Sequence, residues 1–257
     1  MNINDDALAA MVQESTFIFA GTVISRGESS VKTLPAAADL AVVTFGQAFR
    51  VNPMLGNLDG RPITVRLANG ADVPLKERLI FFANSWIHGE EIAVIETGHI
   101  PDDADAERAV SDMVASLPAR HLAERAASAL LVIRGTVRGV DSAGIREPVS
   151  EHSADWMQAL IAVATVLKGK LPAPRIPGSV ALADDSVVLF FPESRAPRWY
   201  SWPKVASRQS GIFLLHTAEP PILLPQGALV APDPSDVLPA NMLQEVRRLL
   251  PKPGATQ

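Results

Sequence analysis

The sequence predicts a mainly β protein with flanking α-helices, built as two tandem five-stranded barrels. Two observations lead to this fold class. The chain contains two copies of one succession of short apolar runs, and each run is rich in β-branched or aromatic residues. Each copy also begins and ends with a segment whose apolar residues have helical spacing. Five short strands fit a small closed barrel better than a sandwich, which usually needs about seven.

The expected elements follow in the same order in both copies, with boundaries marked by Gly, Pro and Asn. The first copy has a helix at 5–14, strands at 15–25, 40–51, 63–67, 78–86 and 91–100, and a helix at 103–117. The second has a helix at 119–128, strands at 128–140, 159–169, 187–191, 211–219 and 227–232, and a helix at 238–250. This alignment predicts that Gly21 matches Gly135 and that Phe81 matches Leu214.

The boundary between the copies is predicted at Pro118, because proline is expected to end the preceding helix and a second helix begins at once. Residues 1–117 then form the first barrel with its N- and C-terminal helices. Residues 118–257 form the second barrel, which carries an extended aromatic and basic loop at 192–211. The helix before Pro118 is amphipathic, with one face formed by Ala106, Ala109, Val110, Met113 and Val114.

Three kinds of motif mark the strands. Gly-Thr-Val occurs in "FAGTVIS" (19–25) and "IRGTVRGV" (133–140), "VLKG" (166–169) ends one strand, and aromatic-leucine runs are "LIFF" and "IFLLH". These stretches resemble the netrin-module and metalloproteinase-inhibitor type of oligonucleotide/oligosaccharide-binding (OB) barrel, over about 80 to 100 residues of each half. The resemblance implies two OB-like barrels in tandem, and it implies a fold rather than an activity.

The whole chain also resembles a family of uncharacterised bacterial proteins. The shared stretches are "REPVSEHSADW" (146–156), "FPESRAPRWYSWPK" (191–204) and "GIFLLH" (211–216). This second resemblance implies no chemistry.

Composition limits the classes of function. A formal net charge of −5 and a pI near 5.6 argue against generic binding to nucleic-acid phosphates. The absence of cysteine excludes disulfides, thiolate metal sites and cysteine nucleophiles. The first residues lack the basic and apolar regions of a secretory signal, and no apolar run reaches the roughly 18 residues of a membrane span. We therefore expect a soluble cytoplasmic protein without a membrane span.

The loop after the strand at 187–191 is the strongest candidate site, because it is nine residues longer than its counterpart and rich in Trp, Tyr and Arg. Two interpretations are open. The loop is either a seam between domains of opposite charge, −8 for residues 1–117 and +3 for the rest, or a ligand site. The seam predicts that Trp199 and Tyr200 are buried. The candidate ligand-binding residues are Arg195, Arg198, Trp199, Tyr200, Trp202 and Lys204.

The function predicted from these features is a non-catalytic binding or scaffolding protein with a peptide or protein ligand. The alternative is binding of single-stranded nucleic acid or glycan through residues 191–204, since OB barrels commonly stack bases. A third hypothesis is a hydrolase or metal enzyme at Glu151, His152 and His216, which with Trp156 form a candidate interface or polar cluster. No G-x-S-x-G, P-loop or H-x-x-x-H pattern is present, so no catalytic residue, metal or cofactor is predicted.

Overall fold

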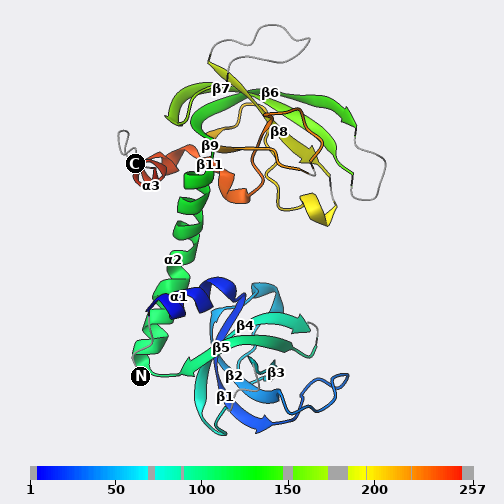
Figure 1. Ribbon diagram of the computed structural model, residues 1–257, viewed down its shortest axis with the longest axis vertical. Helices are drawn as coiled ribbons and strands as arrows, with labels where there is room; N and C mark the ends of the chain where they lie inside the picture. The colour runs from blue at the N-terminus through cyan, green and yellow to red at the C-terminus, as the bar shows by residue number, and fades with distance from the viewer. Residues whose placement is uncertain are drawn as a thin grey trace. The chain divides into compact units, whose positions relative to one another are not determined.

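The computed structural model describes residues 5–68, 73–87, 90–146, 153–172, 185–194, 196–220 and 222–250. The protein is mainly β with flanking α-helices, as the sequence predicts (Figure 1). The chain divides into two compact units, Met1–Pro118 and Ala119–Gln257. In the described part of the chain, no helix combines the length and the apolar character that crossing a membrane requires.

The first unit is a closed five-stranded barrel in the order β1-β2-β3-β5-β4, in which β4 returns to β1. Its pairs are antiparallel except for β3 and β5, which are parallel. The strands are β1 (Phe17–Arg26), β2 (Leu40–Arg50), β3 (Pro62–Arg66), β4 (Arg78–Ile87) and β5 (Ala93–Pro101), with a 3-10 turn, η1, at Pro53–Leu55. Alternate side chains fill the interior, where the Phe19 ring stacks on those of Phe45 and Phe81 at centroid distances of 5.0 and 5.4 Å.

Helices cover the outer face of this barrel. Ile80 and Phe82 of β4 point outward, and they are buried beneath α1 (Asp5–Glu14) and the first turns of α2. The helix α2 runs without interruption from Ala104 to Ser128, so the prediction that Pro118 ends it is wrong. An interior proline costs a helix about 3 kcal/mol. Burial of apolar side chains on both sides of Pro118 offsets this cost, at about 1.5–3 kcal/mol for each large side chain.

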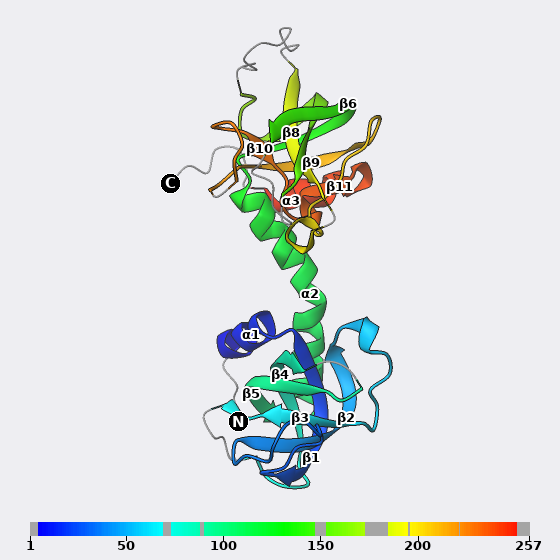
Figure 2. The same ribbon diagram turned by 90° about the vertical axis from the view of Figure 1, so that its right-hand side faces the viewer.

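The second unit is a six-stranded sheet in the order β10-β8-β7-β6-β9-β11, and β10 also pairs with β9, which closes a ring. A short helix, α3 (Leu243–Leu249), lies beside β11 (Figures 1 and 2). It packs through Val246 on the outward side chains of β9. The strands are β6 (Leu131–Arg146), β7 (Asp155–Lys168), β8 (Ser186–Glu193), β9 (Ser210–Thr217), β10 (Leu229–Val230) and β11 (Val237–Pro239). The 3-10 turns are η3 (Pro197–Trp199), η4 (Pro234–Asp236) and η5 (Ala240–Met242).

The sixth strand arises because the last strand of the second barrel is divided. In the first unit, β5 lies along β4 for its whole length. In the second, β10 and β11 lie one after the other along β9, and η4 interrupts them. The parallel pairing of β3 with β5 recurs as the pairing of β8 with β10. The two units thus share one strand order, and the inserted turn is the main departure from the five strands expected.

Gly21 and Gly135 occupy equivalent positions, as predicted, each after an irregularity in the pairing of the first strand of its barrel. A Cβ atom on Gly21 would lie 2.8 Å from the carbonyl oxygen of Thr44, and one on Gly135 would lie 2.6 Å from that of Ala162. Both distances are too short for a carbon–oxygen contact. The Gly-Thr-Val motif therefore marks the place where the first two strands of each barrel approach closely.

The predicted match of Phe81 with Leu214 is wrong by one residue. Phe81 pairs with Phe19 on β1, and the equivalent residue of β6, Ile133, pairs with Phe213. A shift of one residue moves a side chain to the other face of a strand. Accordingly, Phe81 and Phe213 point into their barrels, whereas Leu214 lies on the outer face.

Candidate functional site

Residues 191–204 begin in β8 and fold over the second barrel through η3. Proline at the first position of η3 presets the backbone of this turn, and Ala196 precedes it in an extended conformation. Trp199 is buried, with 1% of its surface exposed, whereas Tyr200 is 84% exposed. The prediction that both rings are buried is therefore right for Trp199 and wrong for Tyr200. Consecutive side chains of a tight turn point in different directions, so one turn covers only one of the two rings.

Three tryptophans form an aromatic cluster outside the barrel interior. Trp156 comes from β7, at a point where the β6–β7 hairpin extends beyond the barrel, and it is 1% exposed. Its ring centroid lies 5.4 Å from that of Trp199 and 5.9 Å from that of Trp202, and both contacts are edge-to-face. Each such pair contributes about 0.5–1.5 kcal/mol beyond area burial. Trp156 is therefore one of the side chains that bury Trp199, together with Trp202, whose ring centroid lies 5.3 Å from that of Trp199.

A cavity of about 370 Å³ opens beside this cluster. One wall is apolar, and is formed by Trp199 and Trp202 from the loop with Ile222 and Val230 from the segments after β9. The rest of the lining is largely polar, with side chains from α2, η3 and the end of β9. These polar residues are Arg125, Arg198, His216, Thr217 and Glu219.

A fully buried carboxylate, Asp236, organises two of these polar residues. It accepts hydrogen bonds from both Nε and Nη2 of Arg125, the first at 2.9 Å, and His216 Nε2 lies 3.2 Å from its Oδ1 atom. An ionised carboxylate only accepts, so His216 Nε2 is the donor of this contact, and Nδ1 is an acceptor in the neutral form of the ring. Among the described residues, Nδ1 has no hydrogen-bond partner.

The turn η4 holds Asp236 in place. Asp233 caps this turn by accepting from the backbone N–H of Ser235, while the Asp236 carboxylate accepts from the backbone N–H of Asp233. His121 Nε2 lies 3.1 Å from the Asp233 carboxylate. Burial alone would raise the pKa of Asp233, but the hydrogen bonds from Ser235 and His121 outweigh it and lower that pKa overall.

Two arginines line this pocket, and Arg198 is the one whose guanidinium forms no ion pair with a described residue. Its guanidinium carbon lies over the ring of Trp199, 4.3 Å from the ring centroid, in a cation–π contact. No carboxylate of the described residues lies within ion-pair distance of it, whereas Arg125 is paired with Asp236. Its N–H groups are therefore available to an acceptor on a ligand.

Lys204 bonds to the backbone of its own loop, whereas the sequence suggests it as a ligand-binding residue. Its Nζ atom donates to the carbonyl oxygens of Pro192 and Trp199, so it ties the two ends of the loop together. Burial lowers the pKa of Lys204, and the nearby Glu193 carboxylate raises it by a smaller amount. Lys204 does not line the cavity.

The structure brings together three of the residues singled out in the sequence, Arg198, Trp202 and His216, around Trp199. Trp156 lies beneath Trp199 and does not line the cavity. Arg195, Glu151 and His152 lie outside the described residues.

Sequence reasoning missed Arg125 and Asp236. "PDPSD" at 232–236 has the signal of a capped turn, which would have pointed to an ordered carboxylate. No local pattern names its partner, because Arg125 lies 111 residues away along the chain.

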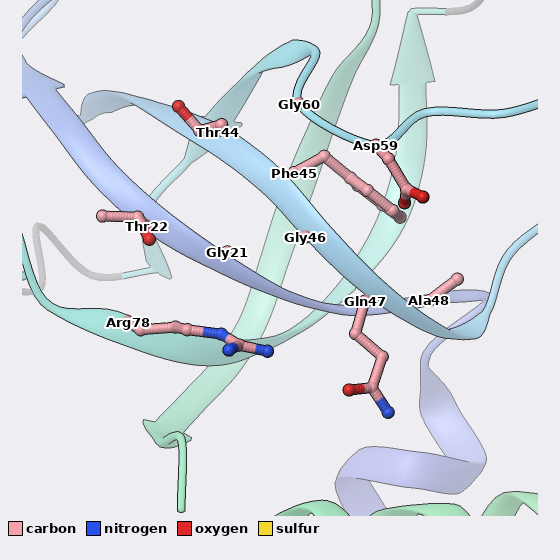
Figure 3. A pocket seen from close by; sticks show the side chains of 10 residues that line it. All are labelled: Gly21, Thr22, Thr44, Phe45, Gly46, Gln47, Ala48, Asp59, Gly60 and Arg78. Atoms are coloured by element: carbon pink, nitrogen blue, oxygen red, sulfur yellow. The ribbon is translucent and has the colours of Figure 1, made fainter.

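The first unit has a cavity of its own, of about 610 Å³, where β1 and β2 cross (Figure 3). Its cation, Arg78, already pairs with Asp102 at 2.6 Å and with Glu107 at 3.3 Å. In Figure 3, Asp59 and Arg78 lie on opposite sides of the two strands, so the polar groups do not converge. The pocket of the second unit combines an aromatic wall with converging polar groups, and we take it as the candidate site.

No protein-family model matches this chain, and no curated protein matches it. The fold and the second-unit pocket are therefore the observations from which function is inferred.

Proposed function

We propose that this protein is a non-catalytic binding protein of two tandem OB-like barrels, and that the second barrel binds a peptide segment of a partner protein. The strand order supports the barrel type, because both units repeat a five-position ring with a parallel pairing of the third and fifth positions. The observation that carries the proposal is the pocket, where an aromatic wall meets the guanidinium of Arg198 and the imidazole of His216.

A peptide has the chemistry that this lining complements. It offers N–H donors to His216 Nδ1, oxygen acceptors to Arg198, and apolar side chains to the wall that includes Trp202. A volume of about 370 Å³ lies near the lower end of the roughly 300–1,000 Å³ typical of ligand pockets. This volume suits one large side chain together with its own backbone groups. Trp and Arg are also the residue types that most often dominate the energetics of protein interfaces.

Single-stranded nucleic acid or glycan is the other ligand that the 191–204 segment suggests. Stacking on bases or sugars requires several exposed aromatic faces. Trp199 is 1% exposed, and the exposed ring of Tyr200 lies outside the pocket lining. Binding to a phosphate backbone requires several free cations, and the ammonium of Lys204 is bonded to carbonyl oxygens. Both facts favour the peptide ligand.

The test is selection of binding peptides from a random library on the purified full-length protein, followed by titration calorimetry. Trp202→Ala and Arg198→Ala are each expected to lower the affinity for the selected peptides at least about tenfold. Truncating a hot-spot residue typically costs about 2 kcal/mol or more of binding free energy. Tyr200→Ala is the matched control, because this exposed ring does not line the pocket. Retained melting temperatures show that the variants are folded.

The proposal fails if the library yields no binder, or if the pocket variants leave affinity unchanged. Oligonucleotides of mixed sequence are titrated in parallel. Binding of these that depends on Tyr200 would assign the segment to the alternative ligand.

A further inference from the structure

We infer that the second-unit pocket recognises the free C-terminal carboxylate of a peptide whose last side chain is large and apolar. The inference rests on the proposed function, and it specifies which part of the peptide enters the pocket and by which groups.

Arg198 is arranged to bind a single carboxylate. Its guanidinium lies over the buried ring of Trp199, at 4.3 Å from guanidinium carbon to ring centroid, and this cation–π contact restrains the side chain. A guanidinium held in this way presents two parallel N–H groups, which match the two oxygens of a carboxylate. The side chain is restrained before binding, so less conformational entropy is lost when the carboxylate arrives.

The other charges of the pocket restrict the ligand to one negative group. Arg125 donates both Nε and Nη2 to the buried Asp236 carboxylate, so its charge is already balanced. Glu219 also lines the pocket and repels a second anion. Among the described lining residues, a ligand with several phosphates would find a counter-ion for one of them, whereas a peptide terminus carries a single negative charge.

His216 supplies the acceptor that distinguishes a terminal residue. Asp236 accepts from His216 Nε2, so in the neutral form of the ring Nδ1 accepts an N–H group. The amide N–H of a peptide's last residue is attached to the same Cα atom as its carboxylate. One terminal residue therefore carries groups for both Arg198 and His216, which line the same pocket of about 370 Å³.

The apolar wall completes the specificity. Trp202, Ile222 and Val230 line the pocket beside these polar groups. An internal Asp or Glu would bring a carboxylate but no apolar side chain on the same Cα atom. A C-terminal Leu, Phe or Trp brings a carboxylate, an N–H group and an apolar side chain together, and this is the combination that the lining complements.

The test compares fluorescein-labelled hexapeptides that end in Leu, Phe or Trp, each made as the free acid and as the carboxamide, by fluorescence anisotropy on the full-length protein. The acids are expected to bind about tenfold to a hundredfold more tightly than the amides, since a hydrogen bond to a charged group contributes about 1.5–3 kcal/mol. Arg198→Gln is expected to reduce this ratio to about one. Glu219→Gln, which removes the like charge, is expected to tighten binding of the acids.

His216→Phe separates the amide contact from the carboxylate contact. This substitution is expected to weaken binding of the free-acid and carboxamide peptides by the same factor, because both carry the backbone N–H group of the last residue. Equal affinity of acid and amide for the wild-type protein overturns the inference while leaving the proposed peptide function standing. Free leucine or phenylalanine binding as tightly as the hexapeptides would also overturn it, and would assign the pocket to amino acids. Failure of both these peptides and the library peptides to bind contradicts the proposed function itself.

Discussion

Replacing Asp236 with alanine is expected to destabilise the second unit by about 3 kcal/mol. The carboxylate is fully buried and accepts hydrogen bonds from Arg125, His216 and the backbone N–H of Asp233. Removing one partner of a buried ion pair typically costs about 3–5 kcal/mol, because the other charge is left without a counter-ion. The Arg125 side chain is 22% exposed, so water hydrates part of it and the lower end of this range applies.

Urea unfolding of the full-length chain, followed by tryptophan fluorescence, measures this change. Three of the four tryptophans, Trp156, Trp199 and Trp202, lie in the second unit, so the signal reports mainly on that unit. The exposed Asp141, on β6, provides a matched control, and Asp141→Ala is expected to change the free energy of unfolding by less than about 0.5 kcal/mol.

A double variant tests the physical reason for the loss. Arg125→Met with Asp236→Leu removes both charges and is expected to be more stable than Asp236→Ala alone, because no unpaired charge remains buried. If Asp236→Ala unfolds within about 0.5 kcal/mol of the wild type, the carboxylate does not organise this region as argued.

Two further predictions concern the loop and the turn. Trp199→Ala is expected to lower the free energy of unfolding by about 3–5 kcal/mol in the same assay, because the ring is 1% exposed. Tyr200→Ala is expected to stay near wild type, since that ring is 84% exposed. A larger loss for Tyr200→Ala than for Trp199→Ala would refute the burial argument. The pKa of Asp233 is lower in the folded protein than its usual 3.8, so this residue stabilises the fold above pH 3.8 and the stabilisation is lost as pH falls toward the folded pKa. The stability difference between wild type and Asp233→Asn should therefore shrink in acid below pH 3.8, and a difference that grows there would contradict it.

Local patterns predict the strands well and their alignment less well. The Gly-Thr-Val motif places Gly21 and Gly135 correctly, because a position without room for a side chain admits only glycine. The match of Phe81 fails because "LIFF" and "IFLLH" are apolar on both faces, toward the barrel interior and toward the covering helices. Without alternation of apolar and polar residues, nothing local marks the register of a strand.

Pro118 illustrates a local rule that packing overrides. The cost of an interior proline is known from its chemistry, and by itself it predicts a helix end. The gain that offsets it comes from side chains elsewhere in α2, such as Val110 and Ala126, which are both fully buried. Their burial depends on which surfaces the helix meets, and no local pattern states this.

The sequence by itself determined the succession of strands and helices, the internal repeat and the mainly β fold class. These properties follow from the period and type of side chains within short segments, where the physical preferences act between near neighbours. Only the tertiary structure decided that Trp199 is buried and Tyr200 is not, and that Arg125, His216 and Asp236 meet beside Arg198. Contacts between segments as far apart as 111 residues depend on how the barrel closes, because the closed sheet and its inserted turn bring those side chains within bonding distance.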